Sequence, residues 1–311
     1  MTIAIARAAR RLRSLSALAR LRPEEPRPPA APPERARELG LAPADSRFIT
    51  GNGLAARCRH VLNYDLPTVN AEIENDWWFC KTDFLEYFFR ELAPDRPFVL
   101  FSHNSDRRIG RAFARHLRRR NLVAWFAANV AVARRRLFAV PLGIANPVWP
   151  HGNPDALAAV QRARIPKTQL FDVTFDVATN RRERLRCLRE TGLELQSPVP
   201  HREYLERLAS SYFCVAPQGN GIDTHRVWEA LYLGTIPIVT RSVLSDQHPD
   251  LPMVVLDDWS EFPSVDFSLD LYERRWGGWR PDELRLDRYL ERVAHELEGI
   301  RDERSRFSAV R

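Results

Sequence analysis

Lysine is almost absent from this chain of 311 residues, and cysteine is scarce. Lys81 and Lys167 are the only lysines, so arginine supplies nearly all of the positive charge. The four cysteines are scattered from Cys58 to Cys214 and form no C-x-x-C pair. This spacing excludes a disulfide scaffold, does not favour a zinc module or a thioredoxin-like motif, and indicates reduced core thiols, as in a cytoplasmic protein. No apolar run approaches the ~20 residues that a membrane span needs.

The charge that is present lies mostly at the beginning of the chain. With 44% hydrophobic and 28% charged residues, the composition excludes bulk disorder. Residues 1–47 carry ten Arg against five acids, whereas the remaining residues carry 37 basic against 35 acidic side chains. The folded body is therefore close to neutral. No recognised nucleic-acid-binding module is evident in it, and we expect no nucleic acid partner.

Residues 1–46 are expected to form a basic segment and a linker in front of the folded body. Residues 1–22 contain six Arg and no acid, with Ile5, Leu12 and Leu15 on one side of a helical projection. This pattern is typical of a helix that lies on an anionic membrane surface, or of a disordered basic arm. Its arginines interrupt the apolar core that a signal peptide needs. The stretch RPEEPRPPAAPPERA then predicts an extended linker.

From residue 47 onward, short apolar runs alternate with helical stretches. We expect strands at 98–103, 122–127, 137–144, 170–175, 212–217, 236–240 and 253–258. We expect helices at 82–92, 109–120, 155–164, 181–190, 201–210 and 282–298, and in RVWEALYLG. This alternation predicts an α/β fold with parallel sheets. A turn-rich joint near 145–155 predicts two Rossmann-like domains facing a cleft, formed by residues 47–150 and 151–311.

The most informative stretch is YFCVAPQGNGIDTHRVWEALYLGTIPIVT, at 212–240. It predicts a strand, a glycine loop, a helix and a second strand, and in open α/β sheets ligands bind at such a strand end. Gly219 and Gly221 would let the backbone approach a ligand and adopt positive φ, and Asp223 would be the N-cap of the helix. The positive end of that helix favours an anion, and a diphosphate suits it best.

Arg226 and Glu229 stand three residues apart and share one face of the expected helix. An arginine on the first turn suits phosphate oxygens, because its planar fork donates two hydrogen bonds side by side. A carboxylate one turn further on suits a vicinal diol such as ribose. The alternative is a surface Arg–Glu pair on an ordinary helix.

The segment PQGNGIDTHRVWEALYLGTIPIV resembles the signature of the exostosin-like glycosyltransferases. The resemblance is close over about 25 residues and looser elsewhere, in KTDFLEYFF, FSHNSD, PLGIANPVWPHGN and ATNRRER. It implies a GT-B fold, with the donor bound by the C-terminal domain, the acceptor held by the N-terminal domain, and inversion at the anomeric centre. By resemblance, Arg226 would contact phosphate, Glu229 the ribose, and the diphosphate would be lined by Gly219, Asn220, Gly221, Asp223 and Thr224.

A second cationic group is expected directly after the strand at 170–175. There Asn180 could act with one of the arginines of ATNRRER, of which Arg184 is our preferred candidate, on the leaving diphosphate. An arginine-rich solvated helix turn is the alternative. A GT-B enzyme needs no metal bridge, and no D-x-D motif follows an apolar strand. We therefore expect no metal and no cofactor.

Inversion needs a general base that takes a proton from the attacking hydroxyl. FSHNSD places His103 and Asp106 just past the carboxyl end of a strand, and these are our candidate catalytic residues. Asp83 and His151 are rivals, and a structural role is the alternative for each. His225 could instead contact the donor.

Two other features invite interpretation. Residues 103–136 contain ten Arg and one acid, which suits an anionic acceptor, a phospholipid surface or a solvated helix face. The aromatics of DWWF and of RRWGGWR could stack on sugars or pack in the core.

The sequence thus predicts a metal-independent inverting glycosyltransferase that transfers sugar from a nucleotide-sugar donor to a glycan or lipid-linked acceptor in bacterial surface polysaccharide synthesis. The alternative is a non-catalytic nucleotide-sugar-binding or membrane-peripheral scaffold.

Overall fold

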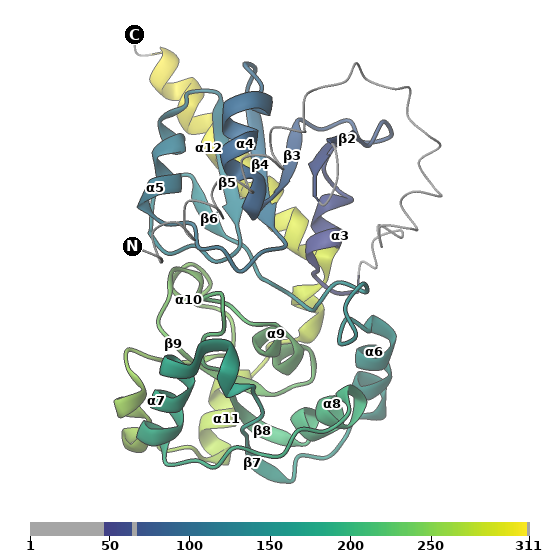
Figure 1. Cartoon of the computed structure of the whole chain (residues 1–311), viewed down its shortest axis with the longest axis vertical. Coiled ribbons are helices and arrows are strands. Elements are labelled where there is room, and N and C mark those ends of the chain that lie inside the picture. Colours follow the sequence, from purple (N-terminus) through teal and green to yellow (C-terminus); the bar gives the residue numbers. More distant parts are fainter. Residues whose placement is uncertain (1–46, 64–66, 310–311) are drawn as a thin grey trace, which may run out of the picture.

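The computed structural model describes residues 47–63 and 67–309. These residues form a mixed α/β molecule with two β-sheets, one above the other in Figure 1. The basic segment and linker expected in residues 1–46 lie outside the described residues.

The first sheet has six strands in the order β2-β1-β3-β4-β5-β6. All neighbouring pairs are parallel except β1 and β2. The strands are β1 (His60–Leu62), β2 (Thr68–Val69), β3 (Trp77–Lys81), β4 (Phe98–His103), β5 (Leu122–Ala127) and β6 (Leu137–Ala139). Every residue of β4 and β5 is buried, and their sequences are apolar apart from Ser102 and His103 at the end of β4. Such apolar runs are typical of parallel sheets that are covered on both faces.

The second sheet has four parallel strands in the order β10-β9-β8-β7. The strands are β7 (Gln169–Asp172), β8 (Ser211–Val215), β9 (Ile236–Thr240) and β10 (Val254–Leu256). The α/β class and the parallel pairing expected from the sequence are confirmed.

Helices surround both sheets and mostly have the expected positions. Around the first sheet lie α3 (Gly51–Ala55), the consecutive segments η1 (Thr82–Phe84), α4 (Leu85–Tyr87) and η2 (Phe88–Leu92), and α5 (Arg111–Ala114) with η3 (Arg115–Arg118). Around the second lie α6 (Pro154–Ala163), η4 (Val177–Asn180), α7 (Arg181–Thr191), α8 (His201–Ala209), α9 (His225–Tyr232), α10 (Val243–Gln247), η5 (Trp259–Ser264), α11 (Leu269–Trp276) and η6 (Pro281–Leu284).

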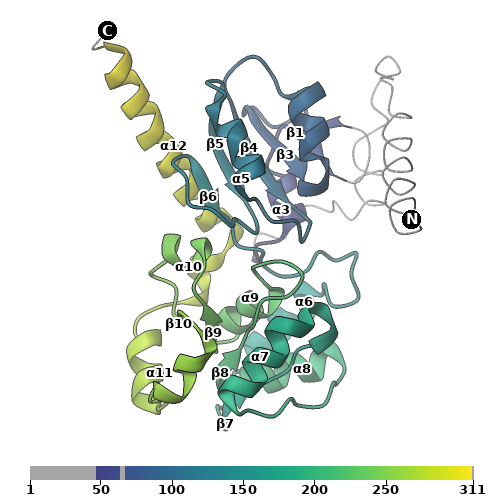
Figure 2. The same ribbon diagram turned by 60° about the vertical axis from the view of Figure 1, so that its left-hand side comes forward.

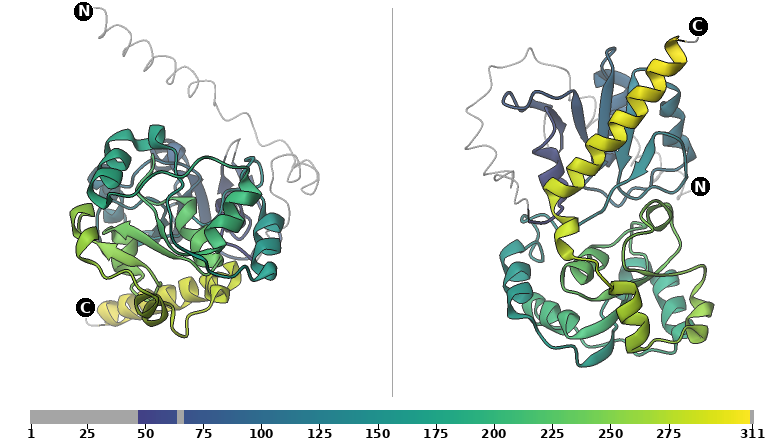
Figure 3. Two further views of the ribbon diagram at one scale, coloured as in Figure 1. Left: turned by 90° about the horizontal axis from the view of Figure 1, so that it is seen from below. Right: turned by 180° about the vertical axis from the view of Figure 1, so that it is seen from behind.

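The last helix, α12 (Leu286–Ala309), leaves the second sheet and runs along the back of the first (Figures 2 and 3). Its buried Val293 and Leu297 belong to the same core cluster as Phe126 of β5. The chain therefore returns, after completing the second sheet, to cover the first.

The two sheets share this core cluster, which also contains Val227 and Trp228 of α9. Tyr232 of α9 joins three segments of the chain. Its hydroxyl accepts a hydrogen bond from the backbone N–H of Ile49 (2.9 Å) and donates one to the carbonyl of Leu284 (2.8 Å), and its ring packs edge-on against Phe48. Helix α9 is therefore fixed against the beginning of the described chain and against the segment η6, which precedes α12.

Candidate functional site

A cleft of about 840 Å³ lies where the carboxyl ends of both sheets meet. From the first sheet, His103 is the last residue of β4 and residues 104–106 follow it, and parts of 142–151 lie beyond β6. From the second, residues 174–176 follow β7, while residues from 217 to 229 belong to the glycine loop after β8 and to α9. This is the edge at which parallel α/β sheets bind ligands. All eleven residues predicted as site residues, except Asn180, line the cleft.

The glycine loop is held in place by a side chain of the first sheet. Asn129, just after β5, accepts hydrogen bonds at Oδ1 from the backbone N–H groups of Ile222 (2.8 Å) and Asp223 (3.0 Å). Its Nδ2 donates to the carbonyl of Ser105 (3.0 Å). Asn129 is buried and has a φ of 57°. The shape of the loop therefore depends on a residue about ninety positions earlier in the chain.

Glycine is required in this loop because a Cβ would not fit. The prediction that these glycines adopt a positive φ is wrong. Neither Gly219 nor Gly221 has a positive φ. A Cβ on Gly221 would lie 2.6 Å from Oδ1 of Asn129, and one on Gly219 would lie 3.1 Å from Nη2 of Arg184. The loop can thus approach these two side chains closely only because both positions lack a Cβ.

The prediction that Asp223 is the N-cap of α9 is wrong, since the N-cap is Thr224. Asp223 is buried and accepts three hydrogen bonds of 2.8 Å, from the backbone N–H of Thr224, from Nε1 of Trp228 and from the backbone N–H of Leu142. Burial raises the pKa of its carboxyl group to about 7. Because Leu142 belongs to the segment after β6, this carboxylate links α9 to the first sheet and is not free to bind a ligand.

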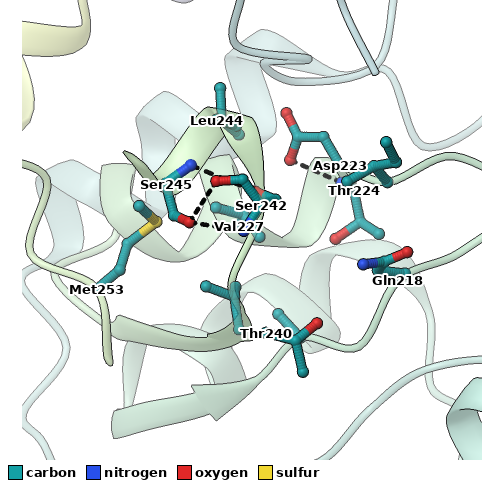
Figure 4. Close-up of a pocket in the computed structure, with 12 residues that line it drawn as sticks. Gln218, Asp223, Thr224, Val227, Thr240, Ser242, Leu244, Ser245 and Met253 are labelled. Atoms are coloured by element: carbon teal, nitrogen blue, oxygen red, sulfur yellow. Dashed lines mark hydrogen bonds between the residues drawn. The ribbon is translucent and has the colours of Figure 1, made fainter. Parts of the chain in front are cut away.

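The N-terminus of α9 opens into the cleft without a side-chain cap. Thr224 makes no capping hydrogen bond, and its buried Oγ1 has no partner among the described residues. Figure 4 shows a second, small pocket, which is lined by Asp223, Thr224, Gln218, Thr240 and the Ser242–Ser245 capping box of α10. The void there measures about 20 Å³, which suits a single water and not a ligand. An anion at this helix end would therefore bind from the cleft.

Arg226 lines the cleft, but its guanidinium is largely bonded to other groups of the protein, and its phosphate contact stays a prediction. Its Nε donates to the carbonyl of Val215 (3.0 Å), and its Nη2 donates to the carbonyl of Asp172 (3.0 Å) and forms an ion pair with the carboxylate of Asp172. Nη1 donates to the hydroxyl of Tyr204 (3.3 Å). The side chain is buried, and its contacts with Asp172 and Val215 hold α9 against β7 and β8.

Glu229 lies one turn further along α9 and reaches the cleft. Its Oε2 accepts a hydrogen bond from Tyr204 (2.8 Å), and its Oε1 lies 3.6 Å from Nε2 of His201, beyond hydrogen-bond distance. Burial acts to raise the pKa of Glu229, but His201, His225 and Tyr204 together outweigh it, and the pKa is below its usual range. The structure therefore holds an ionised carboxylate in the cleft with one oxygen only loosely engaged.

Arg184 is the cation that the cleft offers near the glycine loop. Its Nε donates to the carbonyl of Gln218 (3.2 Å), and its Nη1 donates to the carbonyl of Asp176. Nη2 has no hydrogen-bond partner among the described residues and faces Gly219. Asn180 donates from Nδ2 to the carbonyl of Gly219 (2.9 Å). Asn180 and Arg184, which the sequence analysis paired, thus both contact the glycine loop.

His103 has no free ring nitrogen with which to act as a base. Its Nδ1 accepts a hydrogen bond from the backbone N–H of Asn104 (2.7 Å), and its Nε2 donates to the carbonyl of Pro141 (3.2 Å). Burial lowers the pKa of His103 to about 4, so the ring is neutral. Asp106 is exposed at the cleft wall, with no side-chain hydrogen bond among the described residues.

Asn104 belongs to a network of four asparagines that sequence reasoning did not find. Its Nδ2 donates to Oδ1 of Asn52 (3.0 Å) and of Asn63 (3.1 Å), and its Oδ1 accepts from Asn146 (2.9 Å). Asn104 has a φ of 58°, a conformation that asparagine tolerates better than most residues. The network sets the path of the loop that follows His103 and carries Asp106.

The tryptophan that lines the cleft is not one of those considered for stacking on sugars. Trp77 and Trp78 form strand β3, and Trp276 packs edge-on against Trp279 beside the core. None of them lines the cleft. Trp149 does, and it is 52% exposed. In the sequence it was visible only as part of a turn.

Comparison with known proteins adds no relative: no protein-family model matches the chain, and no curated protein matches it either. Among the described residues, no helix has both the length and the apolar character for crossing a membrane. The same residues contain no group of three or more His, Cys, Asp or Glu side chains placed to hold a metal ion.

Proposed function

We propose that the chain is an inverting glycosyltransferase of the GT-B type, which transfers sugar from a nucleotide-sugar donor to a glycan or lipid-linked acceptor. In this proposal the β7–β10 sheet binds the donor and the β1–β6 sheet holds the acceptor. The resemblance of the glycine loop and α9 to the exostosin-like glycosyltransferases is one support. The geometry of the cleft is the other.

One observation supports the proposal most: three groups suited to a nucleoside diphosphate line the same cleft, all from helices beside the second sheet. They are the uncapped N-terminus of α9, the guanidinium of Arg184 with its open Nη2, and the carboxylate of Glu229. Amides and a guanidinium bind phosphate oxygens, and a carboxylate accepts hydrogen bonds from a ribose diol. In this assignment Arg184 takes the phosphate role expected of Arg226, and Arg226 positions the helix.

The test is a calorimetric titration of the purified protein with UDP, GDP and their sugars, followed by an assay for release of nucleoside diphosphate. We expect one nucleotide to bind and its sugar to be turned over. Glu229→Gln should weaken binding about tenfold or more, because it loses the charged acceptor, while Glu203→Gln on the exposed face of α8 serves as the control. Binding that is unchanged in Glu229→Gln would remove the ribose contact. Binding without turnover would favour the non-catalytic scaffold.

The proposed setting is the cytoplasmic side of a bacterial membrane, where nucleotide sugars are made into surface polysaccharide or glycolipid. The basic residues 1–22 would give peripheral contact with an anionic membrane. Removing residues 1–30 should release the protein from vesicles of phosphatidylglycerol and leave donor turnover unchanged. Vesicle binding that survives this deletion would assign membrane contact to another surface.

A further inference from the structure

His225 is the first residue of α9, and its ring extends from that helix to the first sheet's side of the cleft. Its Nδ1 lies 2.7 Å from the carbonyl oxygen of Gly143, in the segment after β6. A carbonyl oxygen only accepts hydrogen bonds, so Nδ1 carries the hydrogen and the lone pair of the neutral ring is at Nε2. The tautomer of His225 is therefore fixed by the backbone of Gly143.

The carbonyl that fixes the ring is itself held in place. Gly143 has a φ of 65°, and a Cβ there would lie 2.0 Å from the carbonyl oxygen of Ile49. The backbone N–H of Ile144 donates to that same oxygen (2.9 Å). Only glycine fits at this position, and the direction of its carbonyl is consequently well defined.

Nε2 of His225 is free and open to the cleft. It makes no hydrogen bond with any described residue, and it is not among the buried polar atoms that lack a partner. The residue itself lines the cleft. Because Nδ1 is turned towards Gly143, the ring stands between the N-terminus of α9 and the segment after β6. In the proposed function, the diphosphate binds at that N-terminus and the first sheet holds the acceptor, so the ring of His225 lies between the two.

The other candidate groups in the cleft lack this combination. Both ring nitrogens of His103 are engaged, and Nε2 of His201 is buried beside Glu229. His151, whose ring centroid is 6.0 Å from that of His225, has no hydrogen bond that orients it within the described chain. Asp106 is exposed and likewise unoriented.

We propose that His225 is the general base of the transfer reaction, an inference that rests on the proposed function. Nε2 takes the proton from the attacking hydroxyl of the acceptor, or of water when no acceptor is present. The oxygen forms a bond to the anomeric carbon while the bond from that carbon to the diphosphate oxygen breaks. The nucleoside diphosphate leaves with the electron pair, next to Arg184 and the amides of α9. The imidazolium then releases its proton to solvent.

The experiment compares water with azide as the nucleophile. The probes are UDP-glucose, UDP-N-acetylglucosamine and GDP-mannose, with release of nucleoside diphosphate as the readout and mass spectrometry to detect the glycosyl azide. Azide attacks as an anion and needs no base. His225→Asn is the informative variant, because its amide nitrogen occupies the place of Nδ1 and still donates to Gly143, whereas nothing replaces Nε2. His225→Gln, which loses the Gly143 contact, is the second variant.

We expect His225→Asn to bind UDP or GDP as the wild type does, to hydrolyse the donor about 10²-fold or more slowly, and to react with azide at about the wild-type rate. His225→Gln should likewise lose the reaction with water. His295→Asn, on the exposed face of α12, is the matched control and should match the wild type in all assays.

Several results would overturn the inference. One is hydrolysis at the wild-type rate in His225→Asn. Another is an equal loss of the water and azide reactions in His225→Asn, which would make His225 a contact of the leaving group. A loss of nucleotide binding in this variant would make His225 a ligand of the donor. The same selective loss in His151→Asn, with His225→Asn active, would assign the base to His151. A wild-type protein that turns over none of the donors would overturn the proposed function together with this inference.

Discussion

The side chain of Asn129 accepts a hydrogen bond from the backbone N–H of Asp223 across 3.0 Å, and so joins the end of strand β5 to the glycine loop of the other sheet. The same oxygen accepts from Ile222. Because both N–H groups point at one oxygen, a single substitution leaves two donors without a partner.

Replacing Asn129 by alanine should destabilise the protein by about 1–3 kcal/mol, the cost of leaving buried donors unpaired. It should also weaken nucleotide binding, because the loop loses its support. Urea unfolding and calorimetric titration measure the two effects. Asn129→Gly separates the side chain from the backbone, since glycine accepts the φ of 57° without strain. If Asn129→Gly were as stable as the wild type, the hydrogen bonds would contribute nothing.

Adding a methyl group at Gly221 and at Gly299 should have opposite effects. A Cβ on Gly221 would meet Oδ1 of Asn129 at 2.6 Å and Nδ2 at 2.8 Å, so Gly221→Ala should cost about 1–3 kcal/mol of unfolding free energy. A Cβ on Gly299 in α12 meets nothing within 4 Å, and Gly299→Ala should stabilise by about 0.5–1 kcal/mol through helix propensity. Thermal unfolding of both variants checks the pair. A neutral Gly221→Ala would mean that Asn129 can move aside.

Arg184→Ala should weaken the binding of a nucleoside diphosphate about tenfold and leave the binding of the nucleoside unchanged, since only the phosphates reach this guanidinium. Arg182→Ala, on the exposed face of the same helix, is the control. Arg184→Lys should recover part of the affinity, because it keeps the charge and loses the fork. Equal affinity in Arg184→Ala and wild type would contradict the placement of the diphosphate beside Gly219.

His103 should make the protein less stable as the pH falls. In the native state burial lowers the pKa of His103 from 6.5 to about 4, so the unfolded chain takes up a proton that the folded chain refuses between these values. Acidification therefore favours unfolding, and the contribution of this residue amounts to about 3 kcal/mol across the interval. Urea titrations at pH 7 and pH 4.5 on wild type and His103→Gln measure it. The loss between the two pH values should be smaller in the variant, and parallel curves would contradict the prediction.

Much of the fold could be predicted because its buried strands are long and apolar. The runs at 98–103, 122–127 and 236–240 became β4, β5 and β9 with the expected bounds. Strands β1, β2 and β3 were missed, since the first two have only three and two residues and the third had been considered as a sugar-stacking aromatic group. The expected strand at 137–144 ends at Ala139, because Pro141 lacks a backbone N–H and Gly143 has a φ of 65°.

The site was only partly predictable, because sequence spacing reports neighbours along a helix and not partners across the molecule. The spacing of Arg226 and Glu229 placed both on α9, but the guanidinium of Arg226 forms an ion pair with Asp172 of β7, 54 positions earlier in the chain. Arg184 was the weaker candidate and is the cation with the open nitrogen. Asn129 carries no motif at all. Its importance depends on a contact between residues 93 positions apart, for which the chain contains no local signal.

The return of α12 to the first sheet has a practical consequence for dividing the molecule. A fragment made of residues 47–150 would expose the apolar back of β5 that Val293 and Leu297 cover, and it should aggregate when expressed alone. A truncation at the C-terminus would therefore remove α12 and destabilise the first sheet before the second. Any separate expression of the two sheets must therefore supply the last helix to the earlier one, as a fused or co-expressed peptide.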